Sequence, residues 1–205
     1  AGLLCAAVAG ARRRRVLVLE KGNKAGKKIL MSGGGRCNFT NYFVAAENFL
    51  SANPHFCKSA LSRFTQWDFI AMVERHGIAY EERKHGQLFC RDSAADILAM
   101  LLQECEEAGV RIVTRCDIRA VTSVTGGPGL GADGTGAGLH GAMGNRYQVE
   151  FEHMSGSARK QQRLHCQSLV VATGALSIPT LGGSGLGYDI AAQFALPLTT
   201  RRAGL

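Results

Sequence analysis

The residues best suited to chemistry lie in a glycine-rich segment that begins after Lys21 and ends at Asn41. Its centre combines a hydroxyl, bare backbone, a cation, a thiol and an amide in one run: Ser32, Gly33, Gly34, Gly35, Arg36, Cys37 and Asn38. Three successive glycines let backbone amides approach a ligand without side-chain clash, and the cations of Lys28 and Arg36 can offset phosphate charge. The segment therefore predicts a loop that binds a phosphate-bearing ligand.

A second pattern matches half of a dinucleotide-binding fingerprint. The full fingerprint is a strand, a G-x-G-x-x-G turn, a helix and a second strand that ends in an acid for the ribose. Gly2 stands where the third glycine would be, and Glu20 closes the second strand near the expected distance. The pyrophosphate would lie at the amino end of the first helix, where free N–H groups favour an anion. A glycine before a helix and an acid after a strand also occur in other folds.

Cys37 has two interpretations, because a thiol in a ligand-binding loop can be a redox partner or a packing group. It has no C-x-x-C mate and no clearly placed base, which favours packing or loop geometry. The seven cysteines are scattered and odd in number, so we expect reduced thiols without a disulfide framework. The six histidines show no metal-ligand spacing, and the sequence predicts no metal and identifies no catalytic residue.

The elements that must position these residues alternate between helix and strand. A helix is predicted over residues 3–11 and a buried strand over 16–19, and no regular element is expected between 21 and 41. Capping residues and helical spacing then predict three helices, from 53 to about 64, over 66–76 and from 93 to about 108. Alternation predicts a hairpin over 78–91, and a strand is predicted over 110–114. Trp67, Ile70 and Val73 share one face of the second of these helices and are predicted core residues.

The second half of the chain reads as an antiparallel meander followed by a return to the α/β pattern. Strands are predicted over 118–124, 147–152 and 163–167, with a glycine-dense surface loop at 126–144. Residues 169–172 form another continuous apolar run, which predicts a buried strand, and a helix follows at about 188–194.

These motifs resemble the BaiN-like predicted flavoproteins, a family of NAD(P)/FAD-dependent oxidoreductases. The family has an acid and a lysine at a strand end, then a segment of the form G-K-K-(hydrophobic)-S-G-G-G-R-C-N, matched here between Glu20 and Asn41. A second family motif is a strand ending in Ala-Thr-Gly, then Ser, Pro and a G-x-G-Y helix start, matched from Ala172 to Tyr188. The chain departs from the family at Ala175, where a second glycine is usual.

The resemblance implies an FAD cofactor and the residues that hold it. They are Gly2, Glu20 and Lys21 for the ADP half; Lys28, Ser32, Gly33, Gly34, Gly35, Arg36, Cys37 and Asn38 along the pyrophosphate and flavin; Thr173, Gly174 and Ala175 at the second strand end; and Ile118, whose backbone would meet adenine.

The resemblance also implies the fold and the reaction. The expected fold is a doubly wound α/β, glutathione-reductase-like FAD-binding domain with a β-meander crossover. On the family pattern a first strand would precede residue 1 and a substrate-side insert domain would follow residue 205, so we expect a partial FAD-binding domain, truncated at both ends. The expected reaction is hydride transfer through flavin, from NAD(P)H or a small-molecule substrate to an organic acceptor.

The formal charge of +8 leaves open a different function, a basic nucleic-acid-binding module. The densest basic run, four arginines at 12–15, follows a predicted helix whose dipole favours cations, and no aromatic stacking platform accompanies it. We therefore expect no nucleic-acid partner. A further alternative is an ATP pyrophosphatase-type loop, which the strand-like run before Ser32 resembles, although the Asp-Ser that normally follows Ser-Gly-Gly is absent.

No hydrophobic run reaches the roughly eighteen apolar residues that a membrane helix needs. The apolar start of the chain is followed, not preceded, by its basic run, which is the reverse of a signal peptide. We expect a cytoplasmic protein without a membrane partner.

Overall fold

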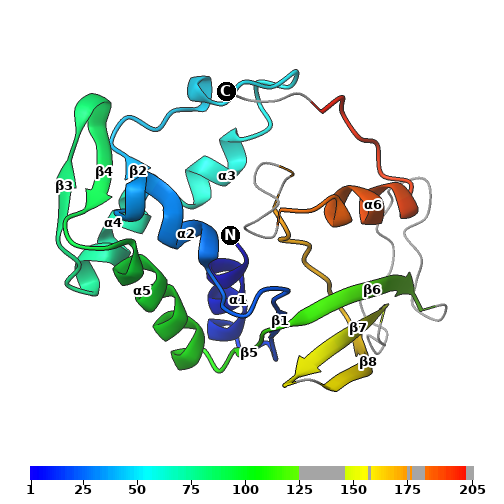
Figure 1. Cartoon of the computed structure of the whole chain (residues 1–205). Coiled ribbons are helices and arrows are strands. Elements are labelled where there is room, and N and C mark those ends of the chain that lie inside the picture. The colour runs from blue at the N-terminus through cyan, green and yellow to red at the C-terminus, as the bar shows by residue number, and fades with distance from the viewer. Residues whose placement is uncertain (125–145, 157, 175, 177–182, 202–205) are drawn as a thin grey trace. The chain divides into compact units, whose positions relative to one another are not determined.

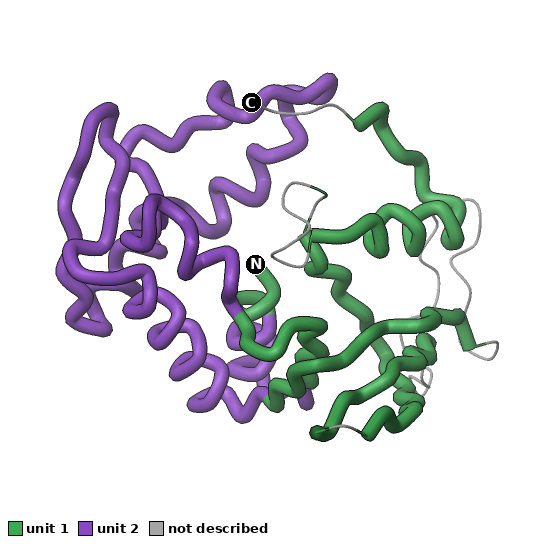
Figure 2. Tube along the Cα trace, viewed as in Figure 1, with its two compact units in different colours: residues 1–5, 17–25, 111–205 green, residues 6–16, 26–110 purple. Residues whose placement is uncertain are grey.

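The computed structural model describes residues 1–124, 146–156, 158–174, 176 and 183–201 of the 205-residue chain. The chain divides into two compact units, shown in separate colours in Figure 2. Unit 1 consists of residues 1–5, 17–25 and 111–205, and unit 2 of residues 6–16 and 26–110. Each unit is described by itself, with its elements labelled as in Figure 1. The predicted glycine-dense loop at 126–144 lies outside the described residues.

A parallel strand pair carries the acid end of the fingerprint in unit 1. β1 (Leu17–Leu19) pairs with β5 (Arg111–Val113), with Leu17 opposite Arg111 and Leu19 opposite Val113. The pairing extends past β1, because the N–H of Glu20 donates to the carbonyl of Val113 over 2.8 Å. Glu20 therefore stands at the carboxyl end of a parallel strand, the edge at which open α/β sheets bind ligands.

The expected meander also lies in unit 1. β6 (Cys116–Ser123), β7 (Tyr147–Ser155) and β8 (Ala158–Cys166) form one antiparallel sheet in the order β6-β7-β8. Its buried side chains come from the first two strands: Cys116, Val121, Val149 and Phe151. β8 starts five residues before the predicted 163, because an exposed edge strand does not need the apolar alternation that the prediction relied on. α6 (Leu186–Gln193) follows, and Gln193 donates to the carbonyl of Val121.

Helices with well-formed caps build the core of unit 2. α1 (Gly2–Ala11) begins in unit 1 and ends in unit 2. Thr65 caps α4 (Gln66–Arg75) by accepting the N–H of Asp68, whose carboxylate accepts the N–H of Thr65 in return. Ser93 caps α5 (Ala94–Glu107) by accepting the N–H of Ala95, and the carboxylate of Asp96 accepts the N–H of Ser93. Each such cap contributes about 1 kcal/mol. The buried side chains of these two helices are Ile70, Val73, Ala94, Ile97, Met100, Leu101 and Cys105.

A small antiparallel sheet completes unit 2 and confirms the predicted hairpin. Its order is β2-β4-β3, with β2 (Asn38–Asn41), β3 (Tyr80–Glu82) and β4 (Gln87–Cys90). The turn between β3 and β4 is η3 (Lys84–Gly86). The central strand is the most buried, with Leu88 and Cys90 fully enclosed. The remaining short elements are α2 (Lys27–Met31), η1 (Ser32–Gly35), η2 (Ala46–Asn48) and α3 (Lys58–Arg63).

Three predictions in unit 2 are wrong in detail. The segment expected to be irregular contains α2, η1 and β2, because the pairing of β2 with β4 is a long-range contact without a local signal. The helix expected from residue 53 begins at Lys58, since the Asn53 side chain accepts the N–H of His55 and forms a local turn instead. Trp67 is not a core residue: it is 56% exposed and stacks on Tyr42, with ring centroids 5.5 Å apart.

The buried strand predicted at 169–172 is absent from the described structure. These residues belong to no strand, and Val170 and Val171 are 63% and 42% exposed. A strand is defined by hydrogen bonds to a neighbour, and no described strand pairs with this run. The continuous apolar run therefore has the composition of a buried strand, but it has no neighbouring strand to pair with among the described residues.

Candidate functional site

Glu20 lies directly after β1 and is held by its own loop. Its Oε1 accepts the backbone N–H of Gly22 over 2.6 Å, and its carbonyl accepts the N–H of Cys116 over 2.9 Å. No described residue bonds the other carboxylate oxygen, Oε2. One oxygen thus fixes the side chain, and the second remains able to accept a hydrogen bond from a ribose hydroxyl.

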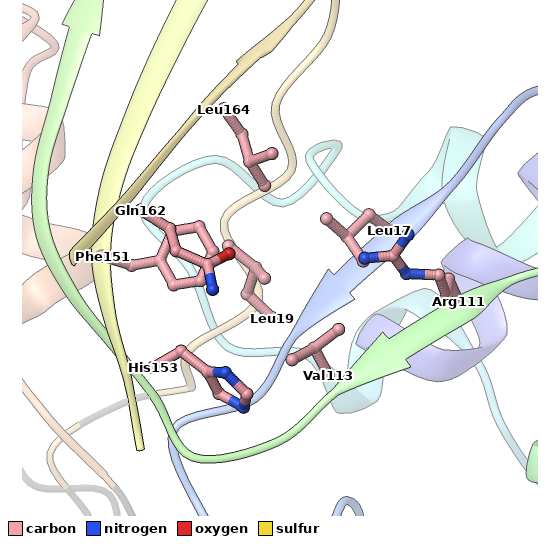
Figure 3. A pocket seen from close by; sticks show the side chains of 8 residues that line it. All are labelled: Leu17, Leu19, Arg111, Val113, Phe151, His153, Gln162 and Leu164. Carbon is pink, nitrogen blue, oxygen red and sulfur yellow. The ribbon is translucent and has the colours of Figure 1, made fainter. Parts of the chain in front are cut away.

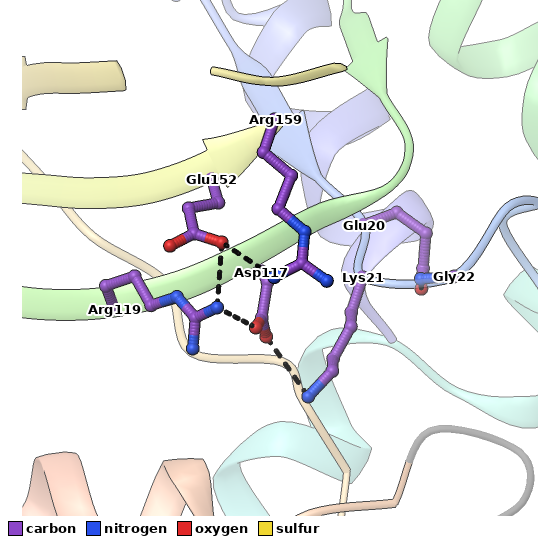
Figure 4. A network of polar contacts seen from close by, with 7 residues as sticks. All are labelled: Glu20, Lys21, Gly22, Asp117, Arg119, Glu152 and Arg159. Carbon is purple, nitrogen blue, oxygen red and sulfur yellow. Dashed lines mark hydrogen bonds and ion pairs between the residues drawn. The ribbon is translucent and has the colours of Figure 1, made fainter. Parts of the chain in front are cut away.

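Lys21 takes part in an ion-pair network that the sequence did not suggest (Figure 4). Its ammonium lies 3.1 Å from Asp117 Oδ1, and Asp117 Oδ2 lies 3.1 Å from the guanidinium of Arg119. Arg119 also donates to Glu152 over 2.8 Å, and this hydrogen bond lowers the pKa of the Glu152 carboxyl. The cation predicted to meet the cofactor is therefore already paired, although its side chain is 64% exposed.

Gly2 and the segment at 172–174 come together within unit 1. A Cβ built on Gly2 would stand 3.3 Å from the Cβ of Ala172, so a larger residue at position 2 would force the helix and the segment apart. The side-chain oxygen of Thr173 would lie 3.1 Å from a Cβ on Gly187, in the first turn of α6. Gly174 has a φ of 75°, and Ala175 lies outside the described residues. The segment thus contacts the first turns of both α1 and α6.

Ile118 lies in β6 at an irregularity of the meander. It pairs with Phe151, and the register shifts between Ile118 and Ala120. A bulge of this kind leaves one residue without its place in the hydrogen-bond ladder between the strands and changes the direction of the backbone. The predicted contact of the Ile118 backbone with adenine therefore falls beside a bulge.

The three glycines of η1 differ sharply in their surroundings. All three have positive φ: 58° at Gly33, 65° at Gly34 and 86° at Gly35. A Cβ on Gly33 would stand 2.7 Å from both the backbone N of Asn38 and the ring of Phe89, which leaves no space for a side chain. A Cβ on Gly34 or Gly35 would meet no described atom within 4 Å. Gly33 is required by the loop itself, whereas the outer faces of Gly34 and Gly35 are open to a ligand.

The polar residues that flank these glycines hold the loop. Ser32 donates to the carbonyl of Ile29 over 2.7 Å, and its carbonyl accepts the N–H of Cys37 over 3.0 Å. Cys37 is buried at a φ of 48°, and burial raises the pKa of its thiol. With its amide oriented to satisfy both neighbours, Asn38 donates to the carbonyls of Thr40 and Leu88.

The two cations of this segment that were predicted to offset phosphate charge differ in their pairing. The guanidinium of Arg36 lies 3.6 Å from Glu81 and is 47% exposed. Lys28, in α2, forms no ion pair with any described residue. Of these two predicted cations, Lys28 is therefore the one that is more available to an added anion.

A small cavity also lies in unit 1, between the β1–β5 pair and the meander (Figure 3). Its volume is about 220 Å³, below the roughly 300 Å³ at which small-molecule sites begin. Its lining is Leu17, Leu19, Arg111, Val113, Phe151, His153, Gln162 and Leu164, none of which was predicted to bind the cofactor.

Neither metal-ligand clusters nor membrane-spanning helices are found in the part of the chain that the structure describes. No three His, Cys, Asp or Glu side chains there are grouped to hold a metal ion, and no helix there is both long and apolar enough to cross a bilayer. All seven cysteines are free thiols.

The predicted site residues fall into two sets. Gly2, Glu20, Lys21, Ile118, Thr173 and Gly174 belong to unit 1, and Lys28 and residues 32–38 belong to unit 2. That both sets hold one cofactor stays a prediction. The residue that the sequence analysis missed is Asp117; the alternating charges of Asp117 and Arg119 on one strand face were a signal that could have indicated it.

Comparison with known proteins places these features in a wider group. A family model described as "HI0933-like protein Rossmann domain" matches residues 1–204. The chain is 47% identical over all 205 residues to a ribosomal RNA dihydrouridine synthase of Escherichia coli and 42% identical over 205 residues to one of Haemophilus influenzae, covering 44% and 45% of those proteins. It is 27% identical over 192 residues, 92% of the chain, to a 3-dehydro-bile acid delta(4,6)-reductase of Clostridium scindens, covering 40% of that protein. The expected Rossmann-like α/β fold is confirmed.

Two consequences follow from these matches. The chain spans less than half the length of the curated relatives that it matches. The expectation of no nucleic-acid partner is wrong, because two relatives that match the whole chain are named as acting on ribosomal RNA. The expectation relied on the lack of an aromatic platform next to residues 12–15, and a short basic run is a poor guide to binding by a surface assembled from distant residues.

Proposed function

The chain belongs to the family of HI0933-like protein Rossmann domains, and from this premise we propose that it is the FAD-binding domain of a flavin-dependent oxidoreductase that reduces uridine in ribosomal RNA. The family is one of FAD-dependent, oxidoreductase-like flavoproteins. The observation that carries the substrate proposal is the 47% identity, over the whole chain, to a ribosomal RNA dihydrouridine synthase, against 27% to a bile acid reductase.

The residues of each unit fit the parts of FAD proposed for them. In unit 1, the free Oε2 of Glu20 suits a ribose hydroxyl, and the close approach of Gly2 to Ala172 is what the third fingerprint glycine provides. In unit 2, the open faces of Gly34 and Gly35 allow a ligand to reach the backbone, and Lys28, which pairs with no described residue, can offset phosphate charge. Both fits depend on positions where the described chain leaves space or a free acceptor.

The proposed reaction adds two hydrogens across the C5–C6 double bond of uracil. When bound, FAD supplies the hydride chemistry. We propose NAD(P)H as the electron source, so that uridine, NAD(P)H and a proton give dihydrouridine and NAD(P)⁺. The residues of this chain contribute binding and orientation of the cofactor, and the proposed setting is the cytoplasm, where ribosomal RNA and NAD(P)H occur together.

The test has two stages. The purified protein is first examined for flavin absorbance that survives gel filtration; a colourless protein that cannot be loaded with FAD would contradict the proposal. The flavin-loaded protein is then incubated without oxygen with NADH or NADPH and ribosomal RNA, and the nucleosides are analysed by mass spectrometry. Formation of dihydrouridine supports the proposal. If the protein instead reduces an unsaturated steroid ketone and leaves the RNA unchanged, its activity is that of the bile acid reductase.

A further inference from the structure

An apolar cavity in unit 2 lies at the end of β2, and none of the residues that line it was predicted to bind FAD. Its volume is about 590 Å³, within the roughly 300–1,000 Å³ of small-molecule sites. Its lining combines two aromatic rings and a valine with two amides and an imidazole: Asn41, Phe43, Val44, Asn48, Phe49 and His85. Phe43 is 69% exposed and Phe49 is 46% exposed. We call these six residues the aromatic cavity.

The exposed ring of Phe43 is held in place by the turn beside it. A Cβ on Gly86 would stand 2.6 Å from this ring and 2.9 Å from Asn41 Oδ1, so the turn backbone lies directly against both. Asn41 accepts the N–H of Phe43 over 2.7 Å and donates to the carbonyl of His85 over 2.8 Å. An aromatic ring that is fixed yet exposed loses little conformational freedom when a flat ligand stacks on it.

Free polar groups face the same cavity. The carbonyl oxygen of the Asn48 side chain accepts the N–H of Ala45 over 2.8 Å, and its NH₂ group has no partner among the described residues. The imidazole of His85 likewise has no hydrogen-bond partner there, and His85 has a φ of 61°, a conformation that is uncommon outside glycine. An amide donor and an imidazole beside two exposed aromatic rings match the needs of a nucleobase, which offers a flat face and polar edges.

The chain segments that supply the aromatic cavity carry more cations than acids. Lys84, next to His85, is exposed and forms no ion pair with any described residue. The segment 42–64 contains Lys58 and Arg63 and a single acid, Glu47, all three exposed. The whole chain carries a formal charge of +8. Exposed aromatic rings interleaved with cations are the usual basis of single-stranded RNA binding.

We infer that the aromatic cavity docks an unpaired base of single-stranded RNA, by stacking on Phe43 and Phe49, and so forms part of the surface that receives the RNA substrate. This inference rests on the proposed function. The sequence analysis looked for aromatic rings only beside the arginines at 12–15. The β2–β4 pairing and the turn at Gly86 bring the distant His85 to the segment that holds Phe43 and Phe49.

The inference is tested by fluorescence anisotropy of a labelled, single-stranded, uridine-rich RNA binding to the flavin-loaded protein. Stacking of one base contributes enough that the double variant Phe43→Ala/Phe49→Ala should bind about tenfold more weakly or worse. The variant Phe43→Tyr/Phe49→Tyr keeps both rings and should bind like the parent protein. Phe56→Ala removes a ring that is 81% exposed but does not line the cavity, and it is the matched control.

The flavin-to-protein ratio and the melting temperature of each variant separate this inference from the proposed function. A tenfold loss with unchanged flavin content and a melting temperature equal to that of Phe56→Ala supports the inference. Unchanged RNA affinity of the alanine double variant in a flavin-loaded, RNA-reducing protein would overturn the inference and leave the proposed function standing. A large fall in melting temperature confined to the alanine double variant would show that protein covers the cavity, and it would overturn the inference too. If the parent protein cannot be loaded with flavin, that result contradicts the proposed function instead.

Discussion

The end of β1 and the glycine turn η1 are both proposed to bind the same cofactor, yet they are built on opposite principles. At the end of β1 the candidate groups are side chains that already have partners: Glu20 bonds Gly22, and Lys21 pairs with Asp117. In η1 the candidate groups are backbone amides, and the outer faces of Gly34 and Gly35 are open. The first region is organised by charge and the second by the absence of side chains.

This difference predicts how each region responds to change. Exposed ion pairs are screened by solvent and salt, so single substitutions among them have small effects on stability. A backbone site with positive φ tolerates no larger residue where the chain itself fills the space. We therefore expect the largest effects in η1, intermediate effects at Glu20, and the smallest in the ion-pair network.

The largest effect is expected for Gly33→Ala. The left-handed conformation costs an alanine about 1–2 kcal/mol, and overlap with Asn38 and Phe89 at 2.7 Å adds to it, so a loss of about 3 kcal/mol or more is expected in the free energy of unfolding. Gly34→Ala has a similar φ and open space, and should lose only the conformational cost of about 1–2 kcal/mol while lowering flavin content. Denaturant unfolding and the flavin-to-protein ratio measure both; equal unfolding losses would contradict the distinction.

Glu20→Ala comes next. Loss of a charged hydrogen bond to the ribose should weaken FAD binding by about 1.5–3 kcal/mol, measured by titration of the flavin-free protein. Because Glu20 also accepts the N–H of Gly22, the alanine variant loses a loop contact as well. Glu20→Gln keeps an acceptor for Gly22 and removes the charge, so it should lie between the parent and the alanine variant. If all three proteins bind FAD with the same affinity, Glu20 is not part of the FAD site.

The thiol of Cys37 should react slowly. Burial raises its pKa, so at pH 8 a smaller fraction is thiolate than for an ordinary cysteine, and the thiolate is the reactive form. Its alkylation by iodoacetamide should be several-fold slower than that of the exposed Cys5 and should accelerate as the pH rises above the usual thiol range. Peptide mass spectrometry of a time course resolves the two residues. Faster labelling of Cys37 than of Cys5 would favour the redox interpretation of this thiol.

The smallest effect is expected for Asp117→Asn. It breaks the ion pairs with Lys21 and Arg119, which are largely exposed, so the unfolding midpoint should fall slightly at low salt and not at high salt. Because the substitution frees Lys21, FAD affinity should stay the same or increase. A marked loss of FAD affinity would mean that the network positions Glu20, and the contrast between the two regions would then be weaker than we propose.

Local rules predicted α4, α5, the hairpin and the meander well, although the cap predicted at Asn53 was wrong. Capping residues and helical spacing predicted the starts of α4 and α5, the break before β4 predicted the hairpin, and alternation predicted the meander. The motif from Glu20 to Asn41 also indicated the family, which the comparisons confirm. Predictions failed where the outcome depends on a distant partner, as for residues 169–172, β2 and the exposure of Trp67.

The sequence by itself determined the turns, the three glycines and the acid after a short apolar strand, because each of these follows from residues within a few positions of one another. Only the tertiary structure decided that other residues fill the space around Gly33 and leave the space beside Gly34 open. It also decided that Lys21 pairs with Asp117, and that Phe43, Phe49 and His85 share one cavity. Each of these outcomes depends on contacts between residues far apart in the chain. Such contacts are set by how the elements pack, and packing leaves no signal in the spacing of neighbouring residues.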